Sequence, residues 1–321
     1  MSFRFLDFPS NRDDLRAEVL AGLTTSPKSI PPKYFYDEQG CRLFELICAQ
    51  PEYALTRAER ALMESRLSDI AAAIGAVDCI VEPGAGDCGK VRLLIEALHP
   101  RGLVVLDIAR IALAAAAESL SRAHPGLAVT ALGMDFIHDL EAAAPYLPEG
   151  RRLIYYPGSS IGNFAPDEAS ALLARFYRLA GTDGQLLIGF DLKKDPVTLH
   201  RAYNDAAGIT AAFNLNLLER LNRELGADFD PARFRHYAFY NPVQGRIEMH
   251  LVSLARQTVS VAGQRFHFTL GETLHTENSC KYRRDEFSAI AESAGWRPAG
   301  EWEEGGFAIH LYGQGDTRSP H

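Results

Sequence analysis

The chain has 321 residues, of which 47% are hydrophobic and 23% are charged, and its formal net charge at pH 7 is −8. This balance is typical of a globular protein with one large domain or two modest ones. Because the chain has no basic excess to neutralise phosphates, we expect neither a nucleic acid nor an anionic membrane as a partner.

Export, membrane insertion and metal binding are not expected either. The first ten residues lack the apolar core of a signal peptide, and no apolar run approaches the roughly 18 residues of a membrane span. The five cysteines are odd in number and form no CxxC motif, and the ten histidines are scattered. We therefore expect a cytoplasmic protein with reduced thiols and no metal site.

The first seventy residues predict helices but no strand of a sheet. Pro31 and Pro32 interrupt the segment, and a helical pattern then runs through Phe44 and Ile47. Thr56, with Glu59 three residues later, is typical of a capping box that opens a helix towards Ile74. The N-terminal segment has no evident place in a sheet.

From about residue 77, short apolar runs alternate with helical stretches. Helices are predicted over 89–98 and up to residue 122, and strands at 79–81, 103–106, 127–132, 153–156 and 185–190. Strands separated by helices in this way indicate right-handed βαβ units, so we predict an α/β fold with a parallel, doubly wound sheet.

The alternation ends after Asp191. Residues 197–225 predict a long amphipathic helix that Gly208 can interrupt, and antiparallel strands follow at 236–240, 246–254, 258–261 and 265–270. Gln244-Gly245 and Ala262-Gly263 stand where hairpin turns are expected. A helix at 285–294 and a strand at 307–312 resume the first pattern, so a smaller unit is predicted as an insertion in the sheet domain.

A glycine-rich loop follows the first strand of the alternating region. Gly84, Gly86 and Gly89 fit the pattern GxGxxG, in which glycines allow a tight turn and the close approach of a ligand. Asp107 ends the next strand, where its carboxylate could accept hydrogen bonds from ribose hydroxyls. A plain structural turn also explains such a match. The pattern does not separate a nicotinamide dinucleotide from S-adenosylmethionine.

Three further residues favour S-adenosylmethionine. Glu82 precedes the glycines, and a carboxylate there suits a cationic sulfonium and its amino group. Asp135 follows the third strand and could accept from an adenine amino group, while Phe136 could cover the adenine ring. Core packing explains Phe136 equally well.

Longer segments are more specific than this loop. They are PPKYFYDEQGCRLFELI (31–47), PEYALTRAE (51–59), EPGAGDCGKVRLL (82–94), GSSIGNF (158–164), AYNDAAGITAAFNLN (202–216), RIEMHL (246–251) and TENSCKY (276–282). In this order they closely resemble the histidine Nα-methyltransferases of ergothioneine biosynthesis. The resemblance implies a Rossmann-like class I methyltransferase domain at 60–193 plus 287–321. It also implies an inserted, smaller α+β domain at 10–59 plus 194–286 that binds the amino acid.

The resemblance implies that S-adenosylmethionine methylates the α-amino nitrogen of histidine successively, giving N,N,N-trimethylhistidine (hercynine). The residues implied at the transfer are Tyr36, Asn163 and Gly158. Those implied at the methyl donor are Tyr36, Gly84, Gly86, Lys90, Asp107, Asp135 and Phe136. Those implied at the amino acid are Tyr53, Gly158, Asn163, Tyr203, Met249, Glu277 and Ser279.

Simpler interpretations exist for several of these residues. Asn163 suits a plain turn, Tyr203 an apolar helix face, and Glu277 a solvated stretch rich in polar residues. If Glu277 faces a pocket instead, it can accept the N–H of an imidazole, with Ser279 on the same side of an extended chain.

Three alternative functions remain at this stage. Ala54 follows Tyr53 where the family often has a second aromatic residue, so the substrate could be another amino acid. The GxGxxG pattern would also suit a nicotinamide-dependent oxidoreductase, although no constellation for hydride transfer is evident. A binding module without activity is the third.

Overall fold

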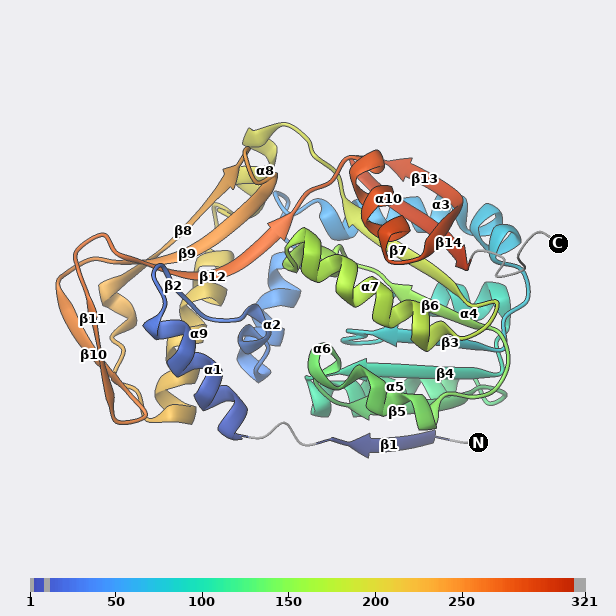
Figure 1. The fold of residues 1–321 in the computed structure, drawn as a ribbon, viewed down its shortest axis with the longest axis horizontal. Helices are drawn as coiled ribbons and strands as arrows, with labels where there is room; N and C mark the ends of the chain where they lie inside the picture. The colour runs from blue at the N-terminus through green and yellow to red at the C-terminus, as the bar shows by residue number, and fades with distance from the viewer. Residues whose placement is uncertain (1–2, 9–11, 315–321) are drawn as a thin grey trace. The chain divides into compact units, whose positions relative to one another are not determined.

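The computed structural model describes residues 3–8 and 12–314, and contacts within the chain divide it into two compact units (Figure 1). Unit 1 comprises Met1–Pro9, Leu55–Lys193 and Lys281–His321, and unit 2 comprises Ser10–Ala54 and Lys194–Cys280. The boundaries between the units fall a few residues before the predicted ones at 59/60 and 286/287.

Unit 1 is built on an eight-stranded sheet with the order β1-β5-β4-β3-β6-β7-β14-β13. The strands are β1 (Phe3–Asp7), β3 (Cys79–Pro83), β4 (Gly102–Asp107), β5 (Ala128–Gly133), β6 (Arg152–Tyr156), β7 (Gln185–Asp191), β13 (Trp296–Glu304) and β14 (Phe307–Gln314). The neighbouring strands β1, β5, β4, β3, β6 and β7 are all parallel to one another. Strand β14 is antiparallel to both β7 and β13. The predicted doubly wound α/β sheet is confirmed, and its five predicted strands agree within two residues.

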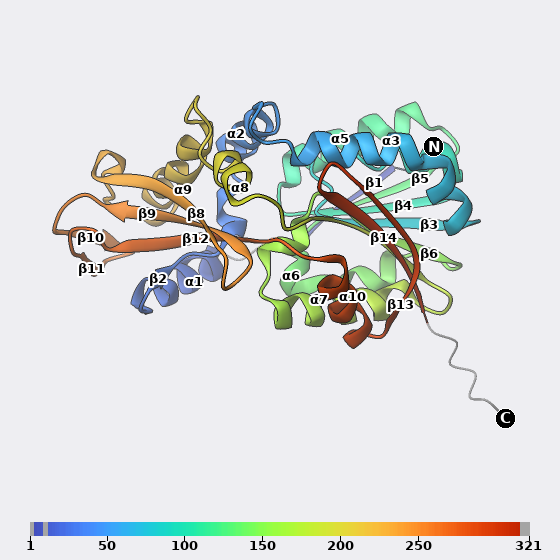
Figure 2. The ribbon, with the colours of Figure 1, turned by 90° about the horizontal axis from the view of Figure 1, so that it is seen from above.

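Helices cover both faces of this sheet. Figure 2 shows α3 (Leu55–Ile74) and α5 (Arg110–Ala123) on one face, and α6 (Phe136–Asp139), α7 (Pro166–Ala180) and α10 (Arg284–Ser293) on the other. The short helix α4 (Arg92–Leu98) packs against α3. Because both faces are covered, the central strands β3 and β7 are buried along their whole length and are mostly apolar.

In unit 1, the expectations for the beginning of the chain and for the start of helix α4 are wrong. Residues 3–7 form β1, which pairs in parallel with β5 from Phe3 opposite Val129 to Asp7 opposite Gly133, so the beginning of the chain extends the sheet. Pairing there satisfies main-chain groups at what would otherwise be an open edge. Helix α4 begins at Arg92 rather than at residue 89, because Cys88 takes a positive φ of 54° and Gly89 N donates to Asp87 Oδ1 at 2.9 Å.

Unit 2 contains a four-stranded sheet with the order β2-β12-β9-β8 and a separate hairpin. The strands are β2 (Lys28–Ser29), β8 (Phe234–Asn241), β9 (Arg246–Ser253), β10 (Gln257–Val261), β11 (Gln264–Phe268) and β12 (Thr273–Cys280). The helices are α1 (Arg12–Thr24), α2 (Glu38–Cys48), α8 (Pro196–Ala202) and α9 (Ile209–Leu225). Both predicted hairpins, β8–β9 and β10–β11, are confirmed as antiparallel pairs. Strand β12 was not predicted, because its sequence is largely polar.

The predicted interruption near Gly208 separates α8 from α9. Gly208 has a φ of +72°, and the Asp205 carboxylate accepts from the amides of Ile209 and Thr210 at 2.8 Å each. These bonds satisfy donors at the start of α9 that have no partner within the helix. Tyr203 is the C-terminal cap of α8. The sequence suggested instead that Tyr203 lies on the apolar face of a helix, and that interpretation is wrong.

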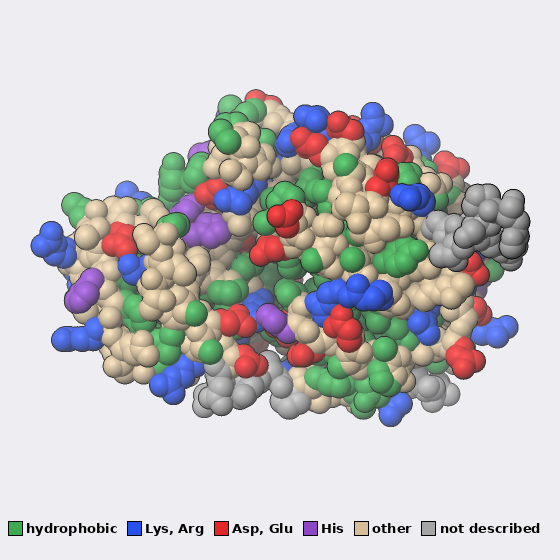
Figure 3. All heavy atoms as spheres, in the orientation of Figure 1, with side chains coloured by type: hydrophobic (Ala, Val, Ile, Leu, Met, Phe, Trp, Pro, Cys, Tyr) green, Lys and Arg blue, Asp and Glu red, His purple; other side chains and the backbone are tan. Residues whose placement is uncertain are grey.

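The described residues contain no helix that is both long and apolar enough to cross a bilayer. On the face shown in Figure 3, Lys and Arg side chains stand among Asp and Glu side chains, and neither kind forms one large patch.

We predict that His310 makes unit 1 sensitive to acid. His310 lies on β14 and is buried against the rings of Phe190 and Phe287, and its Nδ1 lies 3.0 Å from the Tyr312 hydroxyl. Burial, and after it the charge of Arg284, lower the pKa of His310 from 6.5 to about 4. Since the unfolded chain then binds the proton more readily, this stability is complete above about pH 6.5 and is lost as the pH falls towards 4.

Between about pH 7.5 and about pH 5 the loss from this group should be about 2 kcal/mol. Urea denaturation of wild type and His310→Phe at both pH values measures the free energy of unfolding. Between the two pH values, the variant should lose about 2 kcal/mol less than wild type. His99→Asn, at an exposed histidine of the same unit, is the control and should behave as wild type. Equal losses in wild type and His310→Phe would contradict the assignment.

Candidate functional site

One edge of the sheet in unit 1 collects eight of the residues selected from the sequence. Gly84, Gly86 and Lys90 follow β3, Asp107 ends β4, Asp135 and Phe136 follow β5, and Gly158 and Asn163 follow β6. Because the carboxyl ends of neighbouring parallel strands meet at one edge, these residues lie on adjacent loops. The strand order reverses between β3 and β6, which is where ligands bind in open α/β sheets.

The glycine turn is fastened to β4 by Asp107. Gly84 and Gly86 have φ values of +71° and +55°, which favour glycine. Asp107 Oδ2 accepts from Gly86 N and Oδ1 from Ala109 N, both at 2.8 Å. Burial raises the pKa of Asp107, and the hydrogen bonds from these two amides lower it. Each carboxylate oxygen keeps a second lone pair, so a ligand hydroxyl can still bind there.

Asp135 and Phe136 have structural contacts of their own. Asp135 Oδ1 accepts from Ile137 N at 3.0 Å at the start of α6, and Oδ2 lies 2.9 Å from His138 Nδ1. The Phe136 ring stands edge-on to Tyr156, with 6.2 Å between centroids. A Cβ added to Gly84 would lie 3.7 Å from the Phe136 ring, so this aromatic side chain lies beside the glycine turn. Tyr156 was missed by the sequence analysis.

Glu82 is a buried carboxyl group at the end of β3. It is 1% exposed, and its Oε2 has no hydrogen-bond partner among the described residues. Burial raises the pKa of Glu82 well above its usual range, while the charge of Lys90 lowers it. A buried polar atom without a partner is costly, and a ligand that carries a positive charge or an N–H donor would relieve that cost.

Glu59, which the sequence analysis assigned to a helix cap, is also part of this edge. The residue is 4% exposed, with Oε2 2.7 Å from Lys90 Nζ and Oε1 accepting from Gly158 N at 2.6 Å. The capping-box prediction is wrong, because α3 begins at Leu55 and Glu59 lies one turn inside it. Leu55, Glu59, Leu62 and Met63 form the buried stripe of α3, and this spacing was the available signal.

The loop after β6 is held in a defined shape. Gly158 and Ser159 have φ values of +80° and 56°, and a short 3-10 helix follows over Ser160–Asn163. The Ser159 hydroxyl accepts from Asp191 N at 3.0 Å, which ties this loop to the end of β7. Asn163 is half-buried at the end of that helix, as a turn residue would be.

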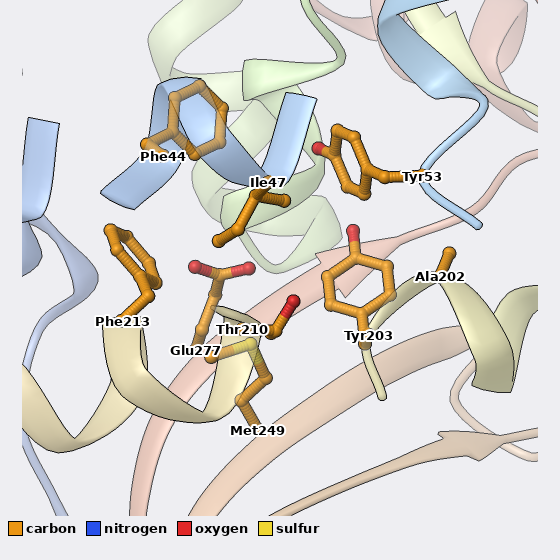
Figure 4. A pocket seen from close by; sticks show the side chains of 9 residues that line it. All are labelled: Phe44, Ile47, Tyr53, Ala202, Tyr203, Thr210, Phe213, Met249 and Glu277. Carbon is orange, nitrogen blue, oxygen red and sulfur yellow. The ribbon is translucent and has the colours of Figure 1, made fainter. Parts of the chain in front are cut away.

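A small pocket lies within unit 2. Its walls are Phe44, Ile47, Tyr53, Ala202, Tyr203, Thr210, Phe213, Met249 and Glu277 (Figure 4). Tyr53, Tyr203, Met249 and Glu277 were predicted from the sequence, and the other five were missed. Phe44 and Ile47 repeat at helical spacing in α2, which signalled a buried face but not a pocket.

The polar groups of the pocket are few. Glu277 is 9% exposed, and Figure 4 shows its carboxylate pointing into the space between Phe213 and Tyr203. It pairs with Met249 across β12 and β9, next to a β-bulge after His275. The solvated interpretation of Glu277 is therefore wrong. None of the described residues that line the pocket is Lys, Arg or His.

The two tyrosines of the pocket belong to one contact network. The Tyr203 hydroxyl donates to Ser279 Oγ at 2.7 Å, and the rings of Tyr53 and Tyr203 meet edge-on with centroids 6.1 Å apart. Burial raises the pKa of Tyr53 well above its usual range, so its phenol stays protonated at neutral pH. Ser279 is buried two residues after Glu277 on the same strand, as the sequence analysis expected.

Tyr36 lies next to the aromatic wall of the pocket. Its ring is 5.7 Å from that of Phe44 and 5.9 Å from that of Phe213, measured between centroids. It belongs to unit 2 together with Tyr53, Tyr203, Met249, Glu277 and Ser279, while the other selected residues belong to unit 1. Within the parts of the chain that are described, no group of three or more His, Cys, Asp or Glu side chains could hold a metal ion.

Known proteins match the chain over nearly its full length. A family model described as "Histidine-specific methyltransferase, SAM-dependent" matches residues 15–313. The histidine N-alpha-methyltransferase of Mycolicibacterium smegmatis is 40% identical, and the match covers 96% of this chain and 97% of that protein. The histidine N-alpha-methyltransferase of Mycobacterium tuberculosis is also 40% identical, and the match covers 92% of this chain and 94% of that protein. Ergothioneine biosynthesis protein 1 of Neurospora crassa is 29% identical over 89% of this chain and 33% of that longer protein.

We predict that Asp37 holds the pocket wall formed by α2. Asp37 Oδ1 accepts from Gly40 N at 2.7 Å and from Asn216 Nδ2 at 2.8 Å, and Oδ2 pairs with Arg223 of α9. Burial alone would raise the pKa of Asp37, but the bonds from Gly40, Arg223 and Asn216 lower it. Asp37→Ala should cost about 1–3 kcal/mol of stability, through the lost cap and the lost link to α9.

Chemical denaturation followed by circular dichroism measures this loss. Glu38→Ala is the control, because this neighbouring residue only forms an exposed pair with Arg42 and should cost little. If Asp37→Ala were no less stable than Glu38→Ala, Asp37 would not be holding α2.

Proposed function

Because the chain belongs to the family of histidine-specific, S-adenosylmethionine-dependent methyltransferases, we propose that it methylates the α-amino nitrogen of histidine. The methyl groups are added successively and give N,N,N-trimethylhistidine for ergothioneine biosynthesis, which the likeness to an ergothioneine biosynthesis protein supports. The chain is thus an N-methyltransferase of the class I fold, and the oxidoreductase alternative is wrong. The observation that carries the choice of substrate is the buried carboxylate of Glu277, which points into a small pocket with an aromatic wall.

The carboxyl-terminal edge of unit 1 fits S-adenosylmethionine. Gly84 and Gly86 turn the backbone so that no side chain obstructs it, and Asp107 keeps acceptor capacity for ribose hydroxyls. The buried Glu82 carboxyl, with Oε2 lacking a partner among the described residues, suits a cationic ligand. Asp135 and Phe136 are proposed at the adenine, and Lys90 supplies a positive charge for the carboxylate of the donor.

The pocket of unit 2 is proposed as the site of the histidine side chain. Glu277 accepts an imidazole N–H, while Phe44, Phe213 and Met249 enclose the faces of the ring. Ser279, oriented by the Tyr203 hydroxyl, lies beside Glu277 as a further polar group. A site built to hydrogen-bond a ring N–H rejects an analogue that lacks it, because its own polar group then loses its partner.

The residues proposed at the transfer itself are Tyr36, Gly158 and Asn163. When bound, S-adenosylmethionine supplies an electrophilic methyl group, so the chain has to orient the amine and keep it neutral. An ammonium has no lone pair to attack with, whereas Asn163 can both accept from and donate to an amino acid. Burial away from water favours the neutral amine, so a strong general base is not required.

The first test is product identification. Incubation of the protein with histidine and S-adenosylmethionine should give mono-, di- and trimethylhistidine in sequence, with every methyl on the α-nitrogen. Tandem mass spectrometry of product made from ring-¹⁵N-labelled histidine locates the methyl groups. Methyl groups on a ring nitrogen would overturn the proposed orientation. If histidine is not methylated but another amino acid is, histidine is not the substrate.

The second prediction concerns selectivity. Glu277→Ala leaves an imidazole N–H without its acceptor, so kcat/KM for histidine should fall by about 2–3 kcal/mol, or some 30–150-fold. The same substitution removes a charge that disfavours apolar rings, so tryptophan and phenylalanine should gain relative to histidine. Steady-state kinetics with each amino acid measure the change.

Glu219→Ala is a suitable control, because this glutamate is exposed on α9 in the same unit. It should leave all three substrates unchanged. Equal activity of wild type and Glu277→Ala on histidine would refute the assignment of the imidazole to this pocket.

A further inference from the structure

We propose that Glu59 is a positioning residue of the methyl-donor site, whose buried carboxylate fixes the Lys90 ammonium and the Gly158 amide together. This inference rests on the proposed function of the edge on which these residues lie. Lys90 follows β3 and Gly158 follows β6, so one side chain from α3 connects the loops on the two sides of the strand-order reversal.

The contacts of Glu59 are those of a bridge. Its two oxygens have different partners, Lys90 Nζ at 2.7 Å and Gly158 N at 2.6 Å. The side chain of Glu59 is 5% exposed, but that of Lys90 is 37% exposed. The lysine side chain is therefore held by a buried carboxylate while part of it remains exposed. A charge-assisted bond to a buried partner restricts the lysine, which is otherwise a flexible point charge.

Two glycines provide the space for this arrangement. A Cβ on Gly158 would lie 2.7 Å from Lys90 Nζ, so a larger residue there would displace the ammonium. A Cβ on Gly189, in β7, would lie 2.7 Å from Glu59 Oε1 and 2.9 Å from the Phe307 ring. Strand β7 and the loops after β3 and β6 thus all approach the same carboxylate.

Gln and Asp substitutions separate charge from shape. Glu59→Gln keeps an oxygen for Gly158 N–H but loses the charge that holds Lys90, so it should weaken binding of S-adenosylhomocysteine by about tenfold. Glu59→Asp keeps the charge, but its shorter side chain cannot reach both partners, and it should show a similar loss. If Glu59→Gln does not fold, Glu59→Asp still provides the measurement. If both variants bind S-adenosylhomocysteine as wild type does, the proposal is wrong.

Calorimetric titration with S-adenosylhomocysteine, without histidine, is the measurement, and each melting temperature is recorded beside it. Lys90→Met and the double variant with Glu59→Gln complete a cycle. If Glu59 acts through Lys90, the double variant should bind within about twofold of Lys90→Met alone. If the losses of affinity in the two single variants multiply in the double variant, Glu59 does not act through Lys90. A lower melting temperature with unchanged affinity would likewise show that Glu59 is only a structural contact.

Glu64→Gln is the matched control, because Glu64 lies on the same helix and only pairs with the exposed Arg60. It should bind S-adenosylhomocysteine as wild type does. Failure of the wild-type protein itself to bind S-adenosylhomocysteine would count against the proposed function, whereas wild-type binding with an unaffected Glu59→Gln would count against the role of Glu59 alone.

Discussion

The reversal of strand order between β3 and β6 is the constraint on which unit 1 depends. Crossover connections between parallel strands are right-handed. Connections that lead from the centre of the sheet towards one edge therefore place their helices on the opposite face from connections that lead towards the other edge. The loops at the carboxyl ends of β3 and β6 therefore separate and leave room for a ligand. The topology creates the space. The sequence then supplies glycines where the backbone must turn and acids where a ligand can be held.

The cost of burying a carboxylate explains which of these acids are available to a ligand. Asp107 accepts from backbone amides and Glu59 from an ammonium and an amide, so both have structural partners, and Asp107 keeps lone pairs for ligand hydroxyls. Glu82 lacks a hydrogen bond at Oε2 among the described residues. We therefore assign Glu82 to the positively charged part of the methyl donor.

The sequence predicted the features that depend on local pattern. Buried parallel strands appear as apolar runs, and the glycine turn, the hairpins and the interruption at Gly208 each have a local chemical signal. Pairing between distant segments has none, which is why β1 was missed. Strand β12 was missed because a strand whose inward side chains form a polar site lacks apolar alternation. Glu59 was misassigned because the same spacing suits a helix cap and a buried stripe, and only the sheet beneath α3 decides between them.

The pocket residues Phe44, Ala202 and Phe213 show a different limit. They come from three segments that are separated along the chain, and each alone is an ordinary packing side chain. The network of Asp37, Asn216 and Arg223 links two of these segments, because it connects the start of α2 to α9. The lining residues of this pocket all belong to unit 2, whereas the residues on the glycine-loop edge all belong to unit 1. Under the proposed function, the contacts to the histidine ring and those to the adenosine part of the donor are therefore encoded in separate parts of the chain, while Tyr36, Gly158 and Asn163 at the transfer come from both.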